Sequence, residues 1–251
     1  MSLFDSFALT FNSLARSRST LAASIKLFFA IMDKSEKIEE QGSFGAGLCL
    51  KHGVEAITRG EEGDFKLEIN YLNGDGDDEL YEEVIKILFD EIPEIGDYSW
   101  ELNIKMSLPV SQGFGMSGAG AVAAASSFQR ALGIAHEESR RRSYLIAHKV
   151  ERIRSTGLGD ITALSAGGVE RRIAVGSPYS GKKLNSGPGK AEGWFEEIPV
   201  ILAWKKETGR HTSNYIDNLE WKQKITSSGK KVMKTISKGS WNKNRWQELI
   251  E

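Results

Sequence analysis

The chain has few of the residues that form disulfides and metal clusters. Its 251 residues include one cysteine, Cys49, and four histidines. A single cysteine excludes an intrachain disulfide and any cysteine metal cluster, and His52, His136 and His211 show no spacing of metal ligands. Such sparse cysteine use fits a reducing compartment, so we expect a cytoplasmic protein.

Strong net charge and long apolar runs are also missing. The formal net charge of -1 gives no general reason to expect nucleic acid or an anionic membrane as a partner. Near the N-terminus only residues 27–32 are apolar without interruption, because Lys26 breaks the stretch before them. Roughly 20 apolar residues are needed to span a bilayer, so we expect a buried strand or helix here. The arginines at 140–142 predict a solvated helix face, and the lysine-rich C-terminal 30 residues an amphipathic helix packed on the body.

The apolar periodicity predicts an α+β protein. Alternation predicts strands, and apolar stripes at helical spacing predict helices. The expected strands are 66–71, 98–108 and 200–205, with further short strands after 169; the expected helices are 80–92, 121–132, 136–152, 213–224 and 230–238. Gly133 is expected to end the second helix. Acidic residues at 75–79 suit the start of the first helix, because its dipole favours carboxylates there.

The stretch LPVSQGFGMSGAGAVAAA, residues 108–125, contains a formal G-x-G-x-x-G match. A dinucleotide site needs a strand buried on both faces before the glycines, whereas the strand at 98–108 alternates strictly, as in an antiparallel sheet. Protein-kinase glycine loops lie between two strands, and no Gly-Lys-Ser/Thr of a Walker loop follows. What remains is a glycine loop feeding a helix N-terminus, which is a good place for phosphates.

Four side chains near this loop have two interpretations each. Ser117 either caps the helix or reaches a magnesium ion and phosphate. Glu151 lies near a helix C-terminus, where the dipole disfavours an acid, so it needs a partner such as Arg152, Arg154 or magnesium. Asp160 follows a glycine, as N-caps often do, and Arg172 taken alone is a surface arginine.

The ordered segments GFGMSGAGAVAAASSFQRALG and IAHKVERIRSTGLGDITALSAGGVERR resemble the GHMP kinases, and more narrowly the archaeal pantoate kinases. GSFGAGLCLKHGV, residues 42–54, is similar to the glycine-rich strand segment of that family. The resemblance covers roughly residues 42–215 and is densest from 109 to 172. It implies a two-lobed α+β fold, with a βαβ lobe carrying the phosphate loop over 1–168 and a short ferredoxin-like lobe over 169–251.

The resemblance also implies the roles of individual residues. It places ATP at a set of loop and helix residues: Pro109, Gly113, Gly115, Ser117, Gly118, Ala119 and Gly120. Ser117 and Glu151 match the positions used for Mg²⁺. Asp160 matches the acid that orients or deprotonates the acceptor hydroxyl, and Arg172 a cation near the substrate carboxylate or phosphate. His148 is expected to pack behind the site.

The expected activity is phosphorylation of pantoate to 4-phosphopantoate, in coenzyme A biosynthesis. The resemblance to the family is also compatible with a homodimer. Two departures from the pantoate kinases stand where the acceptor is expected. Ser24 replaces a histidine and Lys26-Leu27 replaces Thr-Gly in the N-terminal segment, and Phe44 replaces an arginine. A third, C-terminal motif of the superfamily is not found. The alternatives are therefore a GHMP kinase for another hydroxy acid or sugar acid, and a non-catalytic nucleotide-binding protein on the same scaffold.

Overall fold

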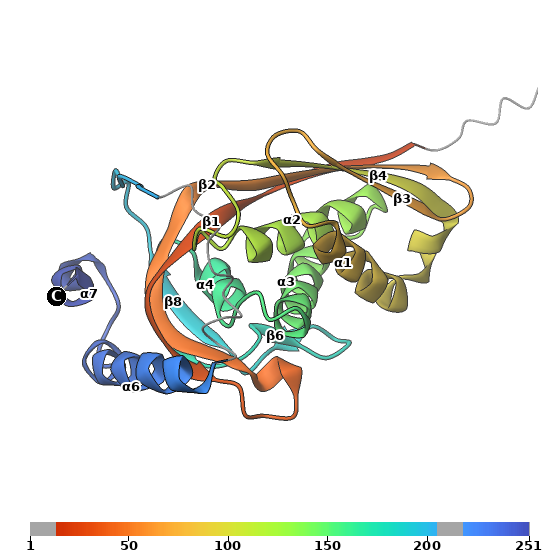
Figure 1. Ribbon diagram of the computed structural model, residues 1–251. Coiled ribbons are helices and arrows are strands. Elements are labelled where there is room, and N and C mark those ends of the chain that lie inside the picture. Colours follow the sequence, from red (N-terminus) through yellow and green to blue (C-terminus); the bar gives the residue numbers. More distant parts are fainter. Residues whose placement is uncertain (1–13, 205–217, 251) are drawn as a thin grey trace, which may run out of the picture.

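The computed structural model describes residues 14–204 and 218–250 (Figure 1). Its strands are β1 Leu14–Met32, β2 Gly42–Glu62, β3 Lys66–Tyr71, β4 Tyr98–Met106, β5 Val169–Ala174, β6 Tyr179–Ser180, β7 Asn185–Ser186 and β8 Lys190–Trp194. Its α-helices are α1 Asp78–Glu91, α2 Met116–Ala131, α3 His136–Ile153, α4 Asp160–Ala166, α6 Leu219–Ile236 and α7 Gln247–Ile250. Short 3-10 helices are η1 Ile38–Glu40, η2 Pro93–Asp97 and η3 Lys243–Arg245.

One sheet organises the molecule, and the long strand β2 is its spine. β1 pairs antiparallel with β2 along nearly its whole length. On the other edge of β2, β5 pairs with residues 45–48 and β4 with residues 54–62, both antiparallel. β3 extends the sheet beyond β4, and β8 extends it beyond β5. The sheet curves, and α1 to α4 lie on its concave side (Figure 1).

The strand predicted at 98–108 is confirmed as β4. Its inward side chains Trp100, Leu102, Ile104 and Met106 are buried, as the alternation predicts. Its pairing is antiparallel to β2, as expected, but parallel to β3. β3, α1 and β4 therefore form the βαβ unit expected of the N-terminal part.

The predicted helices at 121–132 and 136–152 are confirmed as α2 and α3. α2 begins five residues earlier than predicted, directly after the glycine loop, and Gly133 with φ 77° ends it. Its small residues are almost completely buried, which allows α2 to lie deep against the sheet. The main core is shared by this helix, α1, β2 and β4.

Two predictions for the C-terminal part are wrong. Residues 200–204 form no strand, and Ile201 is 97% exposed; residue 205 lies outside the described residues. Instead of helices at 213–224 and 230–238, one helix, α6, runs through 219–236, while 213–217 lie outside the described residues. Gly229, between the two predicted helices, packs on the backbone of Phe29 in β1 and lies within the single helix α6. The prediction of an amphipathic helix packed on the body is confirmed by α6.

The sheet does not break at the predicted boundary between residues 168 and 169. β5 and β8 continue the sheet that β1 and β2 begin. The division into lobes over 1–168 and 169–251, and the ferredoxin-like arrangement of the second, stay predictions. Over the described ranges, the longest apolar helices still fall short of what a bilayer crossing requires.

Candidate active site

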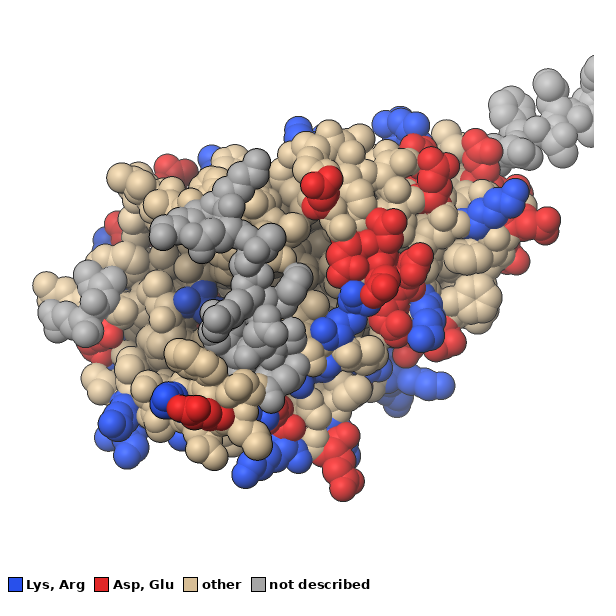
Figure 2. Space-filling view, in the orientation of Figure 1, with Lys and Arg blue, Asp and Glu red and all other residues tan. Residues whose placement is uncertain are grey.

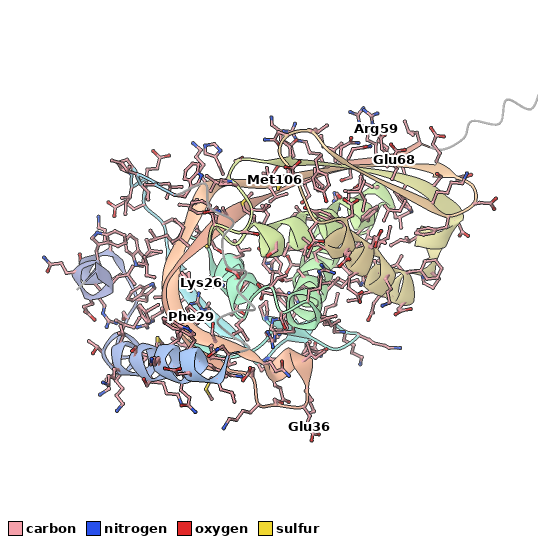
Figure 3. The ribbon with its side chains drawn as sticks, in the orientation of Figure 1. Lys26, Phe29, Glu36, Arg59, Glu68 and Met106 are labelled. Atoms are coloured by element: carbon pink, nitrogen blue, oxygen red, sulfur yellow. The ribbon has the colours of Figure 1, made fainter. Side chains whose placement is uncertain are left out.

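Two irregularities in β1 turn polar side chains towards the concave side of the sheet. The register of β1 against β2 shifts between Ala22 and Ser24 and again between Lys26 and Phe28. Bulges of this kind re-aim side chains next to active sites. Ser24 and Lys26, two residues apart, both reach the same carboxylate on α4, and Lys26 lies inside the curve of the sheet (Figure 3).

That carboxylate is Asp160. Its Oδ1 accepts a hydrogen bond from Ser24 Oγ at 2.9 Å, and its Oδ2 lies 2.5 Å from Lys26 Nζ. The interpretation of Asp160 as an N-cap is wrong, because Gly159 is the N-cap of α4 and Asp160 its first residue. The side chain is therefore free of backbone capping and is held by β1.

Glu151, on α3, lies beside Asp160. The carboxyl group is buried, and neither of its oxygens has a hydrogen-bond partner. Arg152 and Arg154, the two candidate partners, bind elsewhere. Arg152 contacts the Gln41 side chain and the Gly157 carbonyl, whereas Arg154 pairs with Asp77 and with Glu79. The contact between Arg154 and Glu79 lies at the start of α1, where acidic side chains form a patch on the surface (Figure 2).

Three glycines make room for the two carboxylates. A methyl group at Gly157 would overlap Glu151 Oε1 and come within 2.6 Å of Asp160 Oδ2. One at Gly115 would overlap Ser24 Oγ, and one at Gly118 would lie 3.2 Å from the Asp160 Cβ. The glycine loop, α3 and α4 thus meet around a pair of acids, with no side chain between them.

The two acids titrate in opposite directions. Burial, and then the negative charge of Asp160, raise the pKa of Glu151 well above its usual value. Burial alone would also raise the pKa of Asp160, but the ammonium of Lys26 and the hydrogen bond from Ser24 lower it. When the pair holds one proton, that proton therefore resides on Glu151, unless a bound cation stabilises the ionised Glu151 carboxylate.

The glycine loop and the start of α2 lie beside this pair. Ser111, Gly113 and Gly115 have φ of 59°, 81° and 61°, and the Phe114 carbonyl accepts from Ser24 N–H at 2.9 Å. α2 starts at Met116, so its first N–H groups lack intrahelical acceptors. The capping interpretation of Ser117 is wrong, because Gly115 is the N-cap and no side chain caps the helix. Among the described residues, the Ser117 hydroxyl makes no hydrogen bond.

Arg172 occupies a neighbouring, fully buried position, so its interpretation as a surface residue is wrong. It pairs with Gly45 in the sheet, and the missing side chain there lets the guanidinium lie across β2. Its Nη1 donates to Glu170 Oε1. Its Nε and the hydroxyl of Ser43 both lie close to Gly159, at 3.1 Å and 2.5 Å from where a methyl group on that residue would stand. Arg172 thus lies beside the residue that precedes Asp160.

The predicted nucleotide residues divide into two groups. Gly115 and Gly118 lie at the carboxylate pair, and Ser117 stands between them in the sequence, in the first turn of α2. Gly120 instead makes room for the Tyr81 hydroxyl, Ala119 is in the core, and Gly113 is exposed. Pro109, at the start of the loop, has no described contact with the carboxylates.

Two residues outside the pair take packing roles. His148 is buried, and its Nε2–H donates to the Ile38 carbonyl at 3.1 Å, which agrees with the expected packing role. Phe44, expected near the acceptor, packs on the opposite face of β2 with the cluster around Met233 and Ile236.

Sequence reasoning missed four polar side chains of the site. Ser24 and Lys26 stood out only as replacements in the N-terminal segment, and Ser43 and Glu170 were not considered. A lysine that interrupts an apolar strand is the signal for Lys26, since a buried charge needs a partner. Nothing local marks Glu170, whose position follows from the pairing of β5 with β2.

The donor set fits Mg²⁺. This ion is usually held by one or two carboxylates plus substrate phosphates, and it keeps several waters. Glu151 offers two buried oxygens that accept no hydrogen bond, beside Asp160 and close to Gly118 in the first turn of α2, which also carries Ser117. Over the described residues, no group of three or more His, Cys, Asp or Glu side chains forms another candidate metal site.

Known proteins share this architecture. Residues 79–168 match the family model of the GHMP kinases N-terminal domain. The pantoate kinase of Thermococcus kodakarensis is 26% identical over 225 residues, which cover 88% of this chain and 69% of that protein. A solved structure described as a phosphotransferase related to the CoA biosynthesis pathway superposes with a TM-score of 0.70 at 23% identity, covering 95% of this chain and 72% of its own.

A more distant solved structure, MDDEF in complex with MVAPP, AMPPCP and magnesium, has a TM-score of 0.57 at 12% identity, covering 90% of this chain and 68% of its own. At these identities the two structural likenesses establish the fold, which is the mixed α+β fold predicted from the sequence. The family match spans α1, the glycine loop, α2, α3 and α4, and so includes every element that meets at the carboxylate pair except β1. Residues 79–168 are thus a GHMP kinases N-terminal domain by their family match.

Proposed function

We propose that the chain is an ATP- and Mg²⁺-dependent kinase that phosphorylates a hydroxyl group of a small carboxylic acid. Pantoate is the favoured acceptor and 4-phosphopantoate the product, in coenzyme A biosynthesis. The observation that carries the proposal is the placement of Asp160 between Lys26 and Ser24, beside the unpartnered carboxyl of Glu151 and the glycine loop. Pantoate rests on the similarity to the Thermococcus kodakarensis enzyme.

The nucleotide is proposed to bind at the glycine loop. Free N–H groups at the start of α2 and the positive end of its dipole favour phosphate there. Gly113, Gly115, Gly118 and Gly120, with Pro109, Ser117 and Ala119, stay the predicted nucleotide residues. A solved structure of the same fold is described in complex with AMPPCP and magnesium, which supports ATP and Mg²⁺ as the cofactors.

Glu151 and Ser117 are the proposed holders of Mg²⁺. The ion would neutralise charge on the phosphates during transfer. In its absence, burial keeps Glu151 protonated, so binding a cation displaces a proton from this carboxyl.

Asp160 is proposed to orient the acceptor hydroxyl. Its lowered pKa makes it a weak base, so it does not remove the proton before transfer begins. It accepts the proton late, as the hydroxyl oxygen loses basicity in a loose transition state. Lys26, held at Asp160 Oδ2, lies where it can also stabilise charge on the transferred group.

Arg172 is proposed to bind the acceptor's carboxylate. A guanidinium fork holds a carboxylate through two parallel hydrogen bonds. Its Nε and Nη2 are buried and lack partners, and its position next to Gly159 puts the carboxylate site beside Asp160.

The direct test measures ADP release with Mg²⁺–ATP and (R)-pantoate and identifies the product by mass. Phosphopantoate from the wild type, absent with Asp160→Asn, supports the proposal. No product, while ATP still raises the melting temperature, would contradict it and leave two alternatives. Homodimer formation is a separate prediction, checked by solution mass.

The first alternative is a different hydroxy acid or sugar acid as acceptor. It is favoured by Ser24 and Lys26, which replace residues of the pantoate kinases and directly contact Asp160. The second is a non-catalytic nucleotide-binding protein, for which the occupied ion pair at Asp160 is the supporting observation. A panel of acids separates the first alternative, which gives turnover, from the second, which gives only nucleotide binding.

A further inference from the structure

The two adjacent arginines of β5 differ in how many of their side-chain nitrogens have a hydrogen-bond partner. Arg171 and Arg172 point to opposite faces of the strand, and both side chains are buried. Arg171 is fully used: its Nε and Nη2 donate to Glu192, its Nη1 donates to the carbonyl of Ile236 at the end of α6, and its Nη2 also donates to that of Gly239 beyond it. Arg172 has one bond, from Nη1 to Glu170, and its Nε and Nη2 have no partner.

The unpartnered atoms around Arg172 form a pattern of donors and acceptors. Besides Arg172 Nε and Nη2, the buried Glu170 Oε2 and Ser43 Oγ also lack partners. Glu170 and Arg172 are two residues apart on one face of β5, opposite Gly47 and Gly45 of β2. Buried polar groups without partners cost about 1–3 kcal/mol each, so a cluster of them marks a place where a ligand supplies the partners.

Arg172 and Glu170 each favour one chemical group of a ligand. The two N–H donors of Arg172 suit a carboxylate, because a guanidinium binds it through two bonds. Burial raises the pKa of Glu170 to about 7, and the ion pair with Arg172 favours its ionised form. In that form the carboxylate accepts only, so its free Oε2 requires a donor, for which a hydroxyl group is suitable. Glu170 Oε1 contacts Arg172 directly, which places the hydroxyl next to the carboxylate.

We propose that Glu170 is a specificity-determining residue that accepts a hydrogen bond from a hydroxyl adjacent to the acceptor's carboxylate. The acceptor class is then the 2-hydroxy acids, and Glu170 additionally holds Arg172 by Nη1. The proposal rests on the proposed function for the location of the acceptor. It distinguishes pantoate and sugar acids, which carry a 2-hydroxyl, from 3-hydroxy acids such as mevalonate, which do not.

The test is calorimetric binding of a matched pair of acids to the full chain, (R)-pantoate and 4-hydroxy-3,3-dimethylbutanoate, which lacks only the 2-hydroxyl. The wild type is expected to bind pantoate at least about tenfold more tightly, since a site built for a hydroxyl rejects the analogue without it. Glu170→Ala is expected to reduce this ratio to about threefold or less, because water replaces the lost acceptor. Glu170→Gln keeps one oxygen, so its ratio of affinities for the two acids is expected to lie between those of the wild type and Glu170→Ala.

Glu192→Gln is the matched control, because it alters the equivalent carboxylate partner of Arg171 on the other face; its ratio should equal that of the wild type. Equal affinity of the wild type for both acids overturns the inference, and this comparison is sufficient even when no Glu170 variant folds. So does an equal loss for both acids in Glu170→Ala, which indicates a structural role. Turnover is measured separately: preferential binding of the 2-hydroxy acid without phosphorylation refutes the proposed function and leaves the assignment of Glu170 standing.

Discussion

Lys26 and Asp160, 134 residues apart in the sequence, form an ion pair of 2.5 Å in which the side chains are 19% and 4% exposed. The pair joins the irregular part of β1 to the first residue of α4. Because Lys26 lowers the pKa of Asp160, the ammonium sets the charge of the carboxylate on which the proposed chemistry depends.

Replacing Lys26 by methionine should therefore alter both rate and pH dependence. We expect turnover to fall by about 10²–10³-fold, the typical effect of removing one preorganised charge. The pKa of Asp160 rises without the ammonium, so the acidic limb of the rate profile should move to higher pH. Lys222→Met is the control, because Lys222 forms a similar partly buried pair with Asp33 at the end of β1. An unchanged acidic limb in Lys26→Met would refute this role.

Glu151→Gln should remove the pH-dependent cost of burying this acid. When folding raises the pKa of an acid, the free energy of unfolding decreases as the pH increases from the pKa of that acid in the unfolded chain to its pKa in the folded chain. Without magnesium, the variant should match the wild type near pH 5 and exceed it by about 1–3 kcal/mol near pH 8. Melting curves across this range test this, with the exposed Glu138→Gln of the same helix as control. The variant should also lose the Mg²⁺-dependent stabilisation by nucleotide, and retention of it would exclude Glu151 as a ligand.

Gly229→Ala should destabilise the protein although alanine is the better helix former. A methyl group there would overlap the Phe29 carbonyl and lie 2.8 Å from Ala30 N. We expect a loss of about 1–3 kcal/mol, as for other overpacked contacts, instead of the usual gain. Ser228→Ala, exposed on the same helix, should be neutral or slightly stabilising. Denaturant melts of the two variants decide, and equal stability would mean that α6 does not press on β1.

His148→Gln should make the protein less sensitive to acid. Burial lowers the pKa of His148 to about 4, below its unfolded value, so its neutral form stabilises the fold at neutral pH. This stabilisation is lost as pH falls from about 6.5 to 4. Glutamine can still donate to the Ile38 carbonyl but does not titrate. The melting temperature of the wild type should fall more steeply over this interval, and parallel slopes would contradict the assignment.

Local patterns predicted the elements that position the site better than the site itself. Alternation in β4 and the glycines before α2 are local features, and both were predicted. Asp160 and Arg172 came from the family resemblance, because their isolated patterns favoured an N-cap and a surface side chain. The structure reverses both readings through non-local contacts: Gly45, far away in the sequence, gives Arg172 its buried position.

Lys26 and Glu170 show why the remainder was not predictable. The direction of the Lys26 side chain depends on two register shifts in β1, and the position of Glu170 on its pairing with Gly47. Register is a property of two strands together, so one strand's sequence does not define it. The predicted division into helices at 213–224 and 230–238 is wrong for a related reason, because α6 is one helix that contacts β1 at Gly229, and this contact is not local in the sequence.

The pairing of β2 also has a consequence for how the molecule unfolds. β1 covers one edge of β2, while β4 and β5 cover different parts of the other, so none of these three strands can separate without breaking hydrogen bonds to β2. Amide protons in β2 should exchange only through global unfolding, and the chain should melt in a single cooperative transition. The glycine loop follows β4, and Glu170 and Arg172 lie on β5, so both parts of the candidate site are lost in that same event.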